Sequence, residues 1–165
     1  MALIIEDGSI VAGANSFTTD AEFQAYATAR NITLPATEPE RDALQILAVD
    51  YLFSVEDKMK GCRVSIEQEL PYPRKGVCYN GFAVPSNSIP QALKNAQMEL
   101  AIQVNTSDIL VSEQTQNLAS FDVKDVYSES YHGGGSWTEV RTDKANAYLN
   151  PLLVNNGSNN MMSRV

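Results

Sequence analysis

The segment Glu38–Val55 carries the clearest hydrophobic pattern in the chain. On a helical wheel its apolar residues form two stripes on nearly opposite sides, one of Leu44, Leu47, Ala48, Tyr51 and Val55 and the other of Ile46, Val49 and Phe53. Thr37 followed by Glu40 is typical of a capping box, and Pro39 suits the first turn of a helix. The pattern predicts a long helix over Glu38–Val55, surrounded by the other elements at the centre of the fold.

Two further segments have helical periodicity. Thr19 and Glu22 form a second capping-box pattern, which opens a predicted helix over Asp20–Arg30 with Phe23 and Tyr26 on one face. Ser88 and Gln91 form a third pattern, and the helix that follows runs to about Asn105. Its apolar stripe consists of Ile89, Leu93, Ala96, Leu100, Ala101 and Val104. We expect this helix to lie against Glu38–Val55.

The segment between these two long helices, Cys62–Ser88, is rich in proline and glycine. Its prolines exclude a regular helix, because each removes a backbone donor and restricts the residue before it. The same segment contains apolar residues that a linker would lack, namely Val64, Ile66, Leu70, Tyr72, Val77, Phe82 and Val84. We therefore expect an ordered excursion of the chain.

After Thr106 the pattern changes from helical to extended. Phe121–Tyr131 alternates as a strand does, and Gly133–Gly135 then leads into Ser136–Arg141, which predicts a β-hairpin or extended arm. Asp143 can cap a short helix over Lys144–Asn150, whereas Asn155–Val165 is polar and expected to be loose. The predicted fold is mainly α: a small helical bundle in residues 1–111, an arm in 112–142, and a short helix with a tail in 143–165.

The net charge of the chain limits the kinds of molecule that it is expected to bind. The 165 residues carry a formal net charge of −8 with a pI near 4.6, which argues against general affinity for nucleic acid or for an anionic membrane. The N-terminus lacks both the charged start and the long apolar core of a signal peptide, and no run is long enough for a membrane span. We expect a protein made and kept in the cytosol, or in something assembled there.

Catalytic and metal-binding patterns are missing from the sequence. There is no phosphate-binding loop, nucleophile elbow or metalloprotease motif, and the single histidine, His132, stands next to the glycine triplet. Cys62 and Cys78 are expected to be free, partly buried thiols, and a zinc site would need more ligands than they provide. The sequence predicts a protein that is not an enzyme and has no metal or cofactor.

Two smaller features are candidates for specific interactions. Asp50 lies at the edge of the main apolar stripe, where it either pairs with Arg63 or Arg74 or is simply hydrated at the mouth of a groove. Tyr72–Tyr79, which includes Arg74 and Lys75, is the one stretch where aromatic residues and cations occur together. Such a combination can stack bases and contact phosphates, while the other aromatic residues mostly fit core positions.

Several short strings along the chain then point to a family. They are Gly13–Phe17, ALQILAVDYL at Ala43–Leu52, Lys60–Arg63, Gln68–Arg74, Ile89–Gln97 and ANAYLNPLL at Ala145–Leu153. In their order and spacing over nearly the full length, the chain resembles the small head-completion or head–tail connector (adaptor) proteins of tailed bacteriophages. The polar tail and the glycine triplet depart from that family.

The resemblance implies a structural protein of the virion neck, made in the host cytoplasm. It would form a ring of its own copies, expected as a dodecamer in that family, between the portal protein and a tail or stopper (tail-completion) protein. The genome would pass through the lumen without sequence-specific binding, and no membrane would be involved. An acidic chain suits such a channel, because a basic lumen would hold the phosphates.

The resemblance also assigns surfaces. The expected portal-docking residues are Tyr148, Leu149, Leu152, Leu153, Asn159, Met161, Met162, Arg164 and Val165. The residues of the arm expected at the subunit interface are Phe121, Val123, Tyr127, Tyr131 and Trp137. Some relatives carry instead the label of a DnaT-like single-stranded DNA-binding protein, and the alternative function is therefore single-stranded DNA binding in phage replication, with Tyr72–Tyr79 as its groove.

Overall fold

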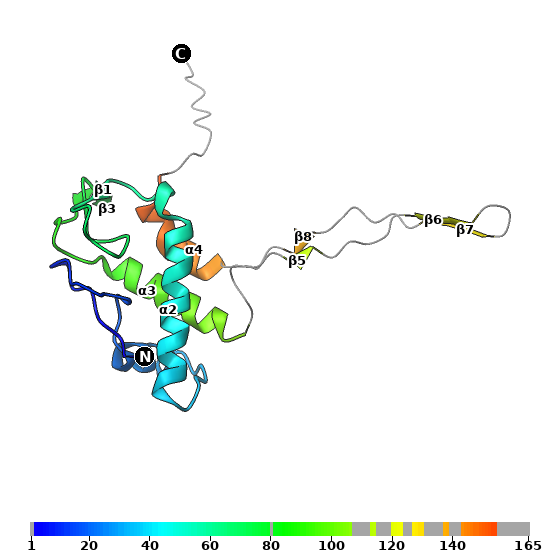
Figure 1. The fold of residues 1–165 in the computed structure, drawn as a ribbon, viewed down its shortest axis with the longest axis horizontal. Coiled ribbons are helices and arrows are strands. Elements are labelled where there is room, and N and C mark those ends of the chain that lie inside the picture. The colour runs from blue at the N-terminus through cyan, green and yellow to red at the C-terminus, as the bar shows by residue number, and fades with distance from the viewer. Residues whose placement is uncertain are drawn as a thin grey trace, which may run out of the picture.

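The computed structural model describes residues 2–79, 81–106 and 143–154 in full, together with the backbone of short strands between residues 113 and 138. Within these residues the chain is mainly helical, as predicted (Figure 1). The helices are α1 (Asp20–Thr28), α2 (Glu38–Ser54), α3 (Gln91–Val104) and α4 (Asp143–Leu149), with the 3-10 turns η1 (Glu56–Lys58) and η2 (Asn150–Leu152). None of the described helices is long and apolar enough to cross a bilayer.

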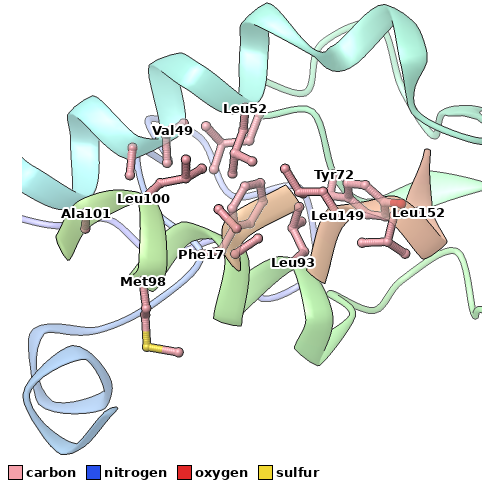
Figure 2. Close-up of a cluster of buried hydrophobic side chains, with 14 of the residues drawn as sticks. Phe17, Val49, Leu52, Tyr72, Leu93, Met98, Leu100, Ala101, Leu149 and Leu152 are labelled. Atoms are coloured by element: carbon pink, nitrogen blue, oxygen red, sulfur yellow. The ribbon is translucent and has the colours of Figure 1, made fainter. Parts of the chain in front are cut away.

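The hydrophobic core lies where α3 packs between α2 and α4 (Figures 1 and 2). The side chains at its centre are almost completely shielded from solvent, and they come from every part of the body: Phe17, Leu52, Tyr72, Leu93, Leu100, Leu149 and Leu152. α4 therefore belongs to the same helical body as the N-terminal half of the chain. Burial of apolar side chains of this size supplies most of the stability of such a body.

α2 is not surrounded by other elements, which corrects the prediction of a central buried helix. Its buried residues, Arg41, Asp42, Gln45, Ala48, Val49 and Leu52, lie on one face. Leu47 is 43% exposed and Phe53 is 38% exposed on the opposite face. The two apolar stripes suggested that both sides are covered, but α2 packs mainly against α3. The buried face runs between the stripes, so each stripe has one buried residue, Ala48 or Val49, and one exposed residue, Leu47 or Phe53.

Only one of the predicted capping boxes forms. At α1, the Thr19 hydroxyl accepts from the N–H of Glu22 at 3.1 Å, and the Glu22 carboxylate accepts from the N–H of Thr19 at 2.9 Å. At α2 the Thr37 hydroxyl instead donates to the Glu40 carboxylate at 2.7 Å. α3 begins after Pro90, whose carbonyl accepts the first helical bonds, so the N-cap position is already taken.

A buried polar network fixes the N-terminal segment to α2 and α3. The side-chain carbonyl of Gln97 accepts from the N–H of Phe17 at 3.0 Å, and its amide donates to the Ser16 hydroxyl at 2.8 Å and to the Gln45 carbonyl at 3.2 Å. The Thr18 hydroxyl donates to the side-chain oxygen of Gln45 at 2.7 Å. All five residues are shielded from water, and the network holds Phe17 in the core.

The excursion between α2 and α3 is ordered, as predicted. It forms two antiparallel hairpins, β1 (Cys62–Arg63) with β2 (Arg74–Lys75) and β3 (Cys78–Tyr79) with β4 (Phe82–Ala83). Gln68 is 2% exposed and organises the first loop, accepting from the N–H of Val64 at 2.8 Å and donating to the Leu70 carbonyl at 2.8 Å. Cys62 and Cys78 are free as expected, but both are exposed rather than partly buried.

The end of the described body is tied back to residues 58–60, at the end of η1 and just before the excursion. Met59 and Leu153 form an antiparallel bridge, the N–H of Lys60 donates to the Leu152 carbonyl at 2.8 Å, and the N–H of Val154 donates to the Lys58 carbonyl at 2.7 Å. Lys60 also donates from Nζ to the Pro151 carbonyl at 2.8 Å. The chain after α4 is therefore anchored by backbone hydrogen bonds up to Val154.

An antiparallel ribbon lies between α3 and α4 in the sequence and away from the helices in space (Figure 1). β5 (Glu113–Gln114) pairs with β8 (Trp137–Thr138), and β6 (Ser120–Val123) pairs with β7 (Tyr127–Ser130). The predicted single strand over Phe121–Tyr131 is thus two paired strands, and the chain reverses between Val123 and Tyr127. Side chains alternate between the two faces in the same way along one long strand and along two shorter paired strands. The alternation in the sequence therefore did not show where one strand ends and the next begins.

Gln97→Leu tests the buried polar network. The substitution leaves the N–H of Phe17 without its acceptor, whereas the Ser16 hydroxyl keeps its hydrogen bonds to Thr18. An unsatisfied buried group costs about 1–3 kcal/mol. We expect the free energy of unfolding to fall by about 2–4 kcal/mol, measured by urea denaturation.

The matched control is Gln91→Leu, at an exposed position in the first turn of the same helix. Its stability should change by less than about 0.5 kcal/mol. Equal stability of the two variants would show that the network contributes nothing.

Candidate functional site

The predicted base-stacking stretch Tyr72–Tyr79 is not an open site. Tyr72 is completely buried, and this burial raises the pKa of its hydroxyl to about 12. Arg74 is 7% exposed, and its guanidinium donates to the carbonyls of Lys60 and Gly61, each at 2.9 Å. Of the two predicted cations only Lys75 is exposed, and Tyr79 is half-buried. These side chains therefore share no surface on which bases and phosphates could bind together.

The predicted ion pair of Asp50 with Arg63 or Arg74 is also wrong. Both arginines bind Glu56, which follows the end of α2: Arg63 makes a bidentate contact at 2.6 Å to each carboxylate oxygen, and Arg74 Nη1 lies 3.2 Å from Oε1. Asp50 faces outward and is exposed. Glu56 could not be singled out from the sequence, because its polar neighbours are typical of an ordinary connection.

Hydrogen bonding from Arg63 is the main reason that the pKa of Glu56 lies below its ordinary value, and the nearby charge of Arg74 adds to the effect. The same arginines hold the first hairpin of the excursion, since Arg63 also donates to the Gln68 carbonyl at 2.8 Å. The cluster of Glu56, Arg63 and Arg74 is thus a structural junction between η1 and the excursion.

A hollow with mixed chemistry lies between the end of α1, α3 and α4. This α1–α4 groove has a volume of about 540 Å³ and is lined by Arg30, Ile32, Glu99, Lys144, Ala147 and Tyr148. A smaller hollow of about 250 Å³ shares Glu99 and Lys144 with it and extends toward Thr106 and Asp143. These two residues flank the segment that contains the ribbon, so the groove lies at the base of the ribbon.

The groove is organised around Glu99, which is 8% exposed. The Tyr26 hydroxyl donates to Glu99 Oε1 at 2.9 Å, and Arg30 Nε lies 3.8 Å from the same oxygen. The Arg30 guanidinium stacks 3.3 Å from the centroid of the Tyr26 ring. Burial and the neighbouring Tyr148 and Glu99 raise the pKa of Tyr26, so its hydroxyl stays protonated and continues to donate.

Chemically, the α1–α4 groove combines cations, an aromatic ring and a carboxylate. Lys144 is exposed and makes no ion pair among the described side chains, and Tyr148 is half-buried beside it. A phosphate could bind Lys144 while a flat ring stacks on Tyr148, but Glu99 limits how much negative charge the groove accepts. Sequence analysis missed this set, because its members come from three separate helices and no local pattern joins them.

The predicted docking and interface residues have different outcomes. Leu149 and Leu152 are completely buried in the core, so they cannot form a docking surface in this body. Tyr148 lines the α1–α4 groove, and Leu153 is half-buried. Phe121, Val123, Tyr127 and Trp137 belong to strands of the ribbon. The remaining predicted residues, Tyr131, Asn159, Met161, Met162, Arg164 and Val165, lie outside the described part of the chain.

Glu56→Gln tests the ionic junction. The lowered pKa of Glu56 means that its charged form stabilises the fold fully above its ordinary value of 4.5, and that this contribution is lost as the pH falls through the lowered pKa. We expect the variant to be about 1–3 kcal/mol less stable near pH 7. The difference from wild type should shrink below about pH 4, as measured by urea denaturation across pH.

The control for this junction is Glu67→Gln, which removes an exposed carboxylate from the same excursion. It should leave stability unchanged within about 0.5 kcal/mol. A Glu56→Gln variant whose deficit stays constant down to low pH would contradict the ionic explanation.

Comparison with known proteins gives one result. A family model described as "Putative DnaT-like ssDNA binding protein" matches residues 1–165. No curated protein and no solved structure matches the chain significantly. The match agrees with the alternative function drawn from the sequence better than with the connector function. It covers the whole chain, and the protein therefore belongs to this DnaT-like family.

Proposed function

We propose that the protein is a structural subunit of a ring, and specifically a head–tail connector between the portal and the tail of a tailed bacteriophage. The observation that carries this proposal is the combination of an acidic helical body with an antiparallel ribbon that lies away from it (Figure 1). This combination suits a subunit that binds its neighbours and lets DNA pass.

The charges of the body support a surface from which DNA is released easily. Among the fully described residues, many cations are already held in ion pairs with carboxylates: Arg30, Arg41, Arg63, Arg74 and Lys94. Affinity for nucleic acid comes largely from cations that neutralise phosphates. Cations that are held by carboxylates contribute little to such affinity, so the body is poorly suited to grip a strand.

The ribbon supports assembly. A two-stranded ribbon has two edges with unpaired backbone groups, and such edges pair readily with another chain. A ring needs a heterologous contact, in which one surface of a subunit meets a different surface of the next. The proposed interface residues in the described strands are Phe121, Val123, Tyr127 and Trp137.

Portal docking is proposed mainly for the polar segment after Val154. With Leu149 and Leu152 assigned to the core, the docking residues that remain are the half-buried Tyr148 and Leu153 and those of the tail, Asn159, Met161, Met162, Arg164 and Val165. A backbone hydrogen bond holds Val154 on the helical body. The tail would therefore start from a fixed point on the body when it docks.

The test of the connector function is the copy number of this polypeptide in purified, DNA-filled particles of the virus that encodes it. We expect about a dozen copies in each particle, because a single closed ring has a fixed number of subunits. Quantitative mass spectrometry against a labelled standard measures this number. A protein that is abundant in infected cells and missing from particles would overturn the proposal.

Single-stranded DNA binding is a second candidate, favoured by the family match over residues 1–165. The α1–α4 groove is the described place that fits it, since Lys144 could hold a phosphate and Tyr148 could stack a base. This site replaces the predicted Tyr72–Tyr79 groove, whose arginine and first tyrosine are buried.

Fluorescence anisotropy with a labelled oligothymidylate separates the two functions. A connector should bind it no more tightly than about 10⁻⁴ M at physiological salt, as weak non-specific complexes do. If the protein instead binds in the micromolar range, Lys144→Ala should weaken binding roughly tenfold and reduce its salt dependence. Lys75→Ala is the control, because Lys75 is an exposed cation outside the groove. Tight binding lost only in Lys144→Ala would put the second candidate first.

A further inference from the structure

We propose that the outward face of α2 binds the hairpin surface of another copy of this chain, in a head-to-tail contact. The outer α2 face consists of Ala43, Ile46, Leu47, Asp50, Phe53 and Ser54, and the hairpin surface consists of Ile66, Lys75 and Phe82. The inference rests on the proposed function, because it names the surfaces through which the subunits of a ring meet.

The outer α2 face is apolar with a single charge. Leu47 and Phe53 are exposed by 43% and 38%, and Ile46 is partly exposed between them. Asp50 lies in the middle of this face, is exposed, and its carboxylate makes no ion pair within the described part of the chain. Covering such a face buries apolar area favourably but leaves one carboxylate that needs a cation.

The hairpin surface has the complementary composition. Ile66 is 96% exposed and Phe82 is 76% exposed, which are the highest values among the described large hydrophobic residues. Both come from the excursion that carries β1 to β4, and Figure 1 shows β1 and β3 at the same end of the molecule. Lys75 in β2 is exposed and, within the described residues, makes no ion pair. It can supply the cation that Asp50 lacks.

Charge decides which surfaces meet. A symmetric contact between two α2 faces would bring Asp50 against Asp50, and a symmetric contact between two hairpin surfaces would bring Lys75 against Lys75. Like charges placed together at an interface disfavour it strongly. Contact between the two different surfaces pairs Asp50 with Lys75 and covers both apolar sets. Such a heterologous contact propagates from copy to copy and closes into a ring when its rotation permits.

Disulfide trapping tests the contact in the full-length chain, because it captures weak encounters as well as stable complexes. The exposed native thiols are first removed by Cys62→Ser and Cys78→Ser. Ser54→Cys then places one thiol on the outer α2 face, and Glu67→Cys in a separate preparation places one beside Ile66, with Asp50 and Lys75 unchanged. Covalent dimers are measured after mild oxidation of each variant and of their mixture.

We expect dimers in the mixture and few in either variant alone. Ala25→Cys, at an exposed position of α1, is the matched control and should give little product with Glu67→Cys. Charge reversal adds a second measurement: Asp50→Lys in the first variant, or Lys75→Glu in the second, should lower the yield by at least about fivefold. Both reversals together should restore it.

Several outcomes would overturn the inference. They are dimers of Ser54→Cys with itself that equal those in the mixture, equal trapping of the control pair, no trapping, or no restoration by the double charge reversal. If trapping fails while particles contain about a dozen copies, these two surfaces are wrong and the connector function stands. If trapping succeeds and particles contain no copies, the chain self-associates without being a connector.

Discussion

The hydrogen bonds of the buried Gln97 amide are the constraint on which the rest of the structure depends. An amide without partners is expensive to bury, so this position in α3 requires donors and acceptors from elsewhere. They come from Ser16, Phe17 and Gln45, at distances between 2.8 and 3.2 Å. Because these partners belong to the N-terminal segment and to α2, the network fixes how both pack on α3. These hydrogen bonds therefore set the position of Phe17 in the core. They also set how closely α2 packs against α3.

Much of the helical body could be predicted from the sequence, because its signals are local. The bounds of α1, α2, α3 and α4 agree with the predictions to within about two residues, since helical periodicity and proline positions are read within a few turns. The depth of burial was not predicted. Two apolar stripes on α2 suggested cover on both sides. The sequence alone does not show that the buried face lies between the stripes, with Leu47 of one stripe and Phe53 of the other left exposed.

Candidate sites were harder to predict, because their partners are distant in sequence. Asp50 was expected either to pair with Arg63 or Arg74 or to be hydrated; Glu56 binds both arginines instead, and Asp50 is exposed. The α1–α4 groove joins Arg30, Glu99 and Lys144 only after the helices pack. Arg74 illustrates the opposite error, since a cation beside tyrosines suggests an exposed binding surface, whereas here it holds backbone carbonyls of the excursion. Which of these side chains are buried depends on how the whole chain folds, and a local sequence pattern does not show it.

The placement of α4 has a consequence for the order of events during protein synthesis. Leu149 and Leu152, near the end of the described body, complete a core to which Phe17 contributes from its beginning. A nascent chain on the ribosome therefore cannot close this core until α4 has emerged, long after α2 and α3 have been made. Until then the face of α3 that packs against α4 remains open. A product truncated before α4 therefore lacks the side chains that close the core, although its α1, α2 and α3 are complete.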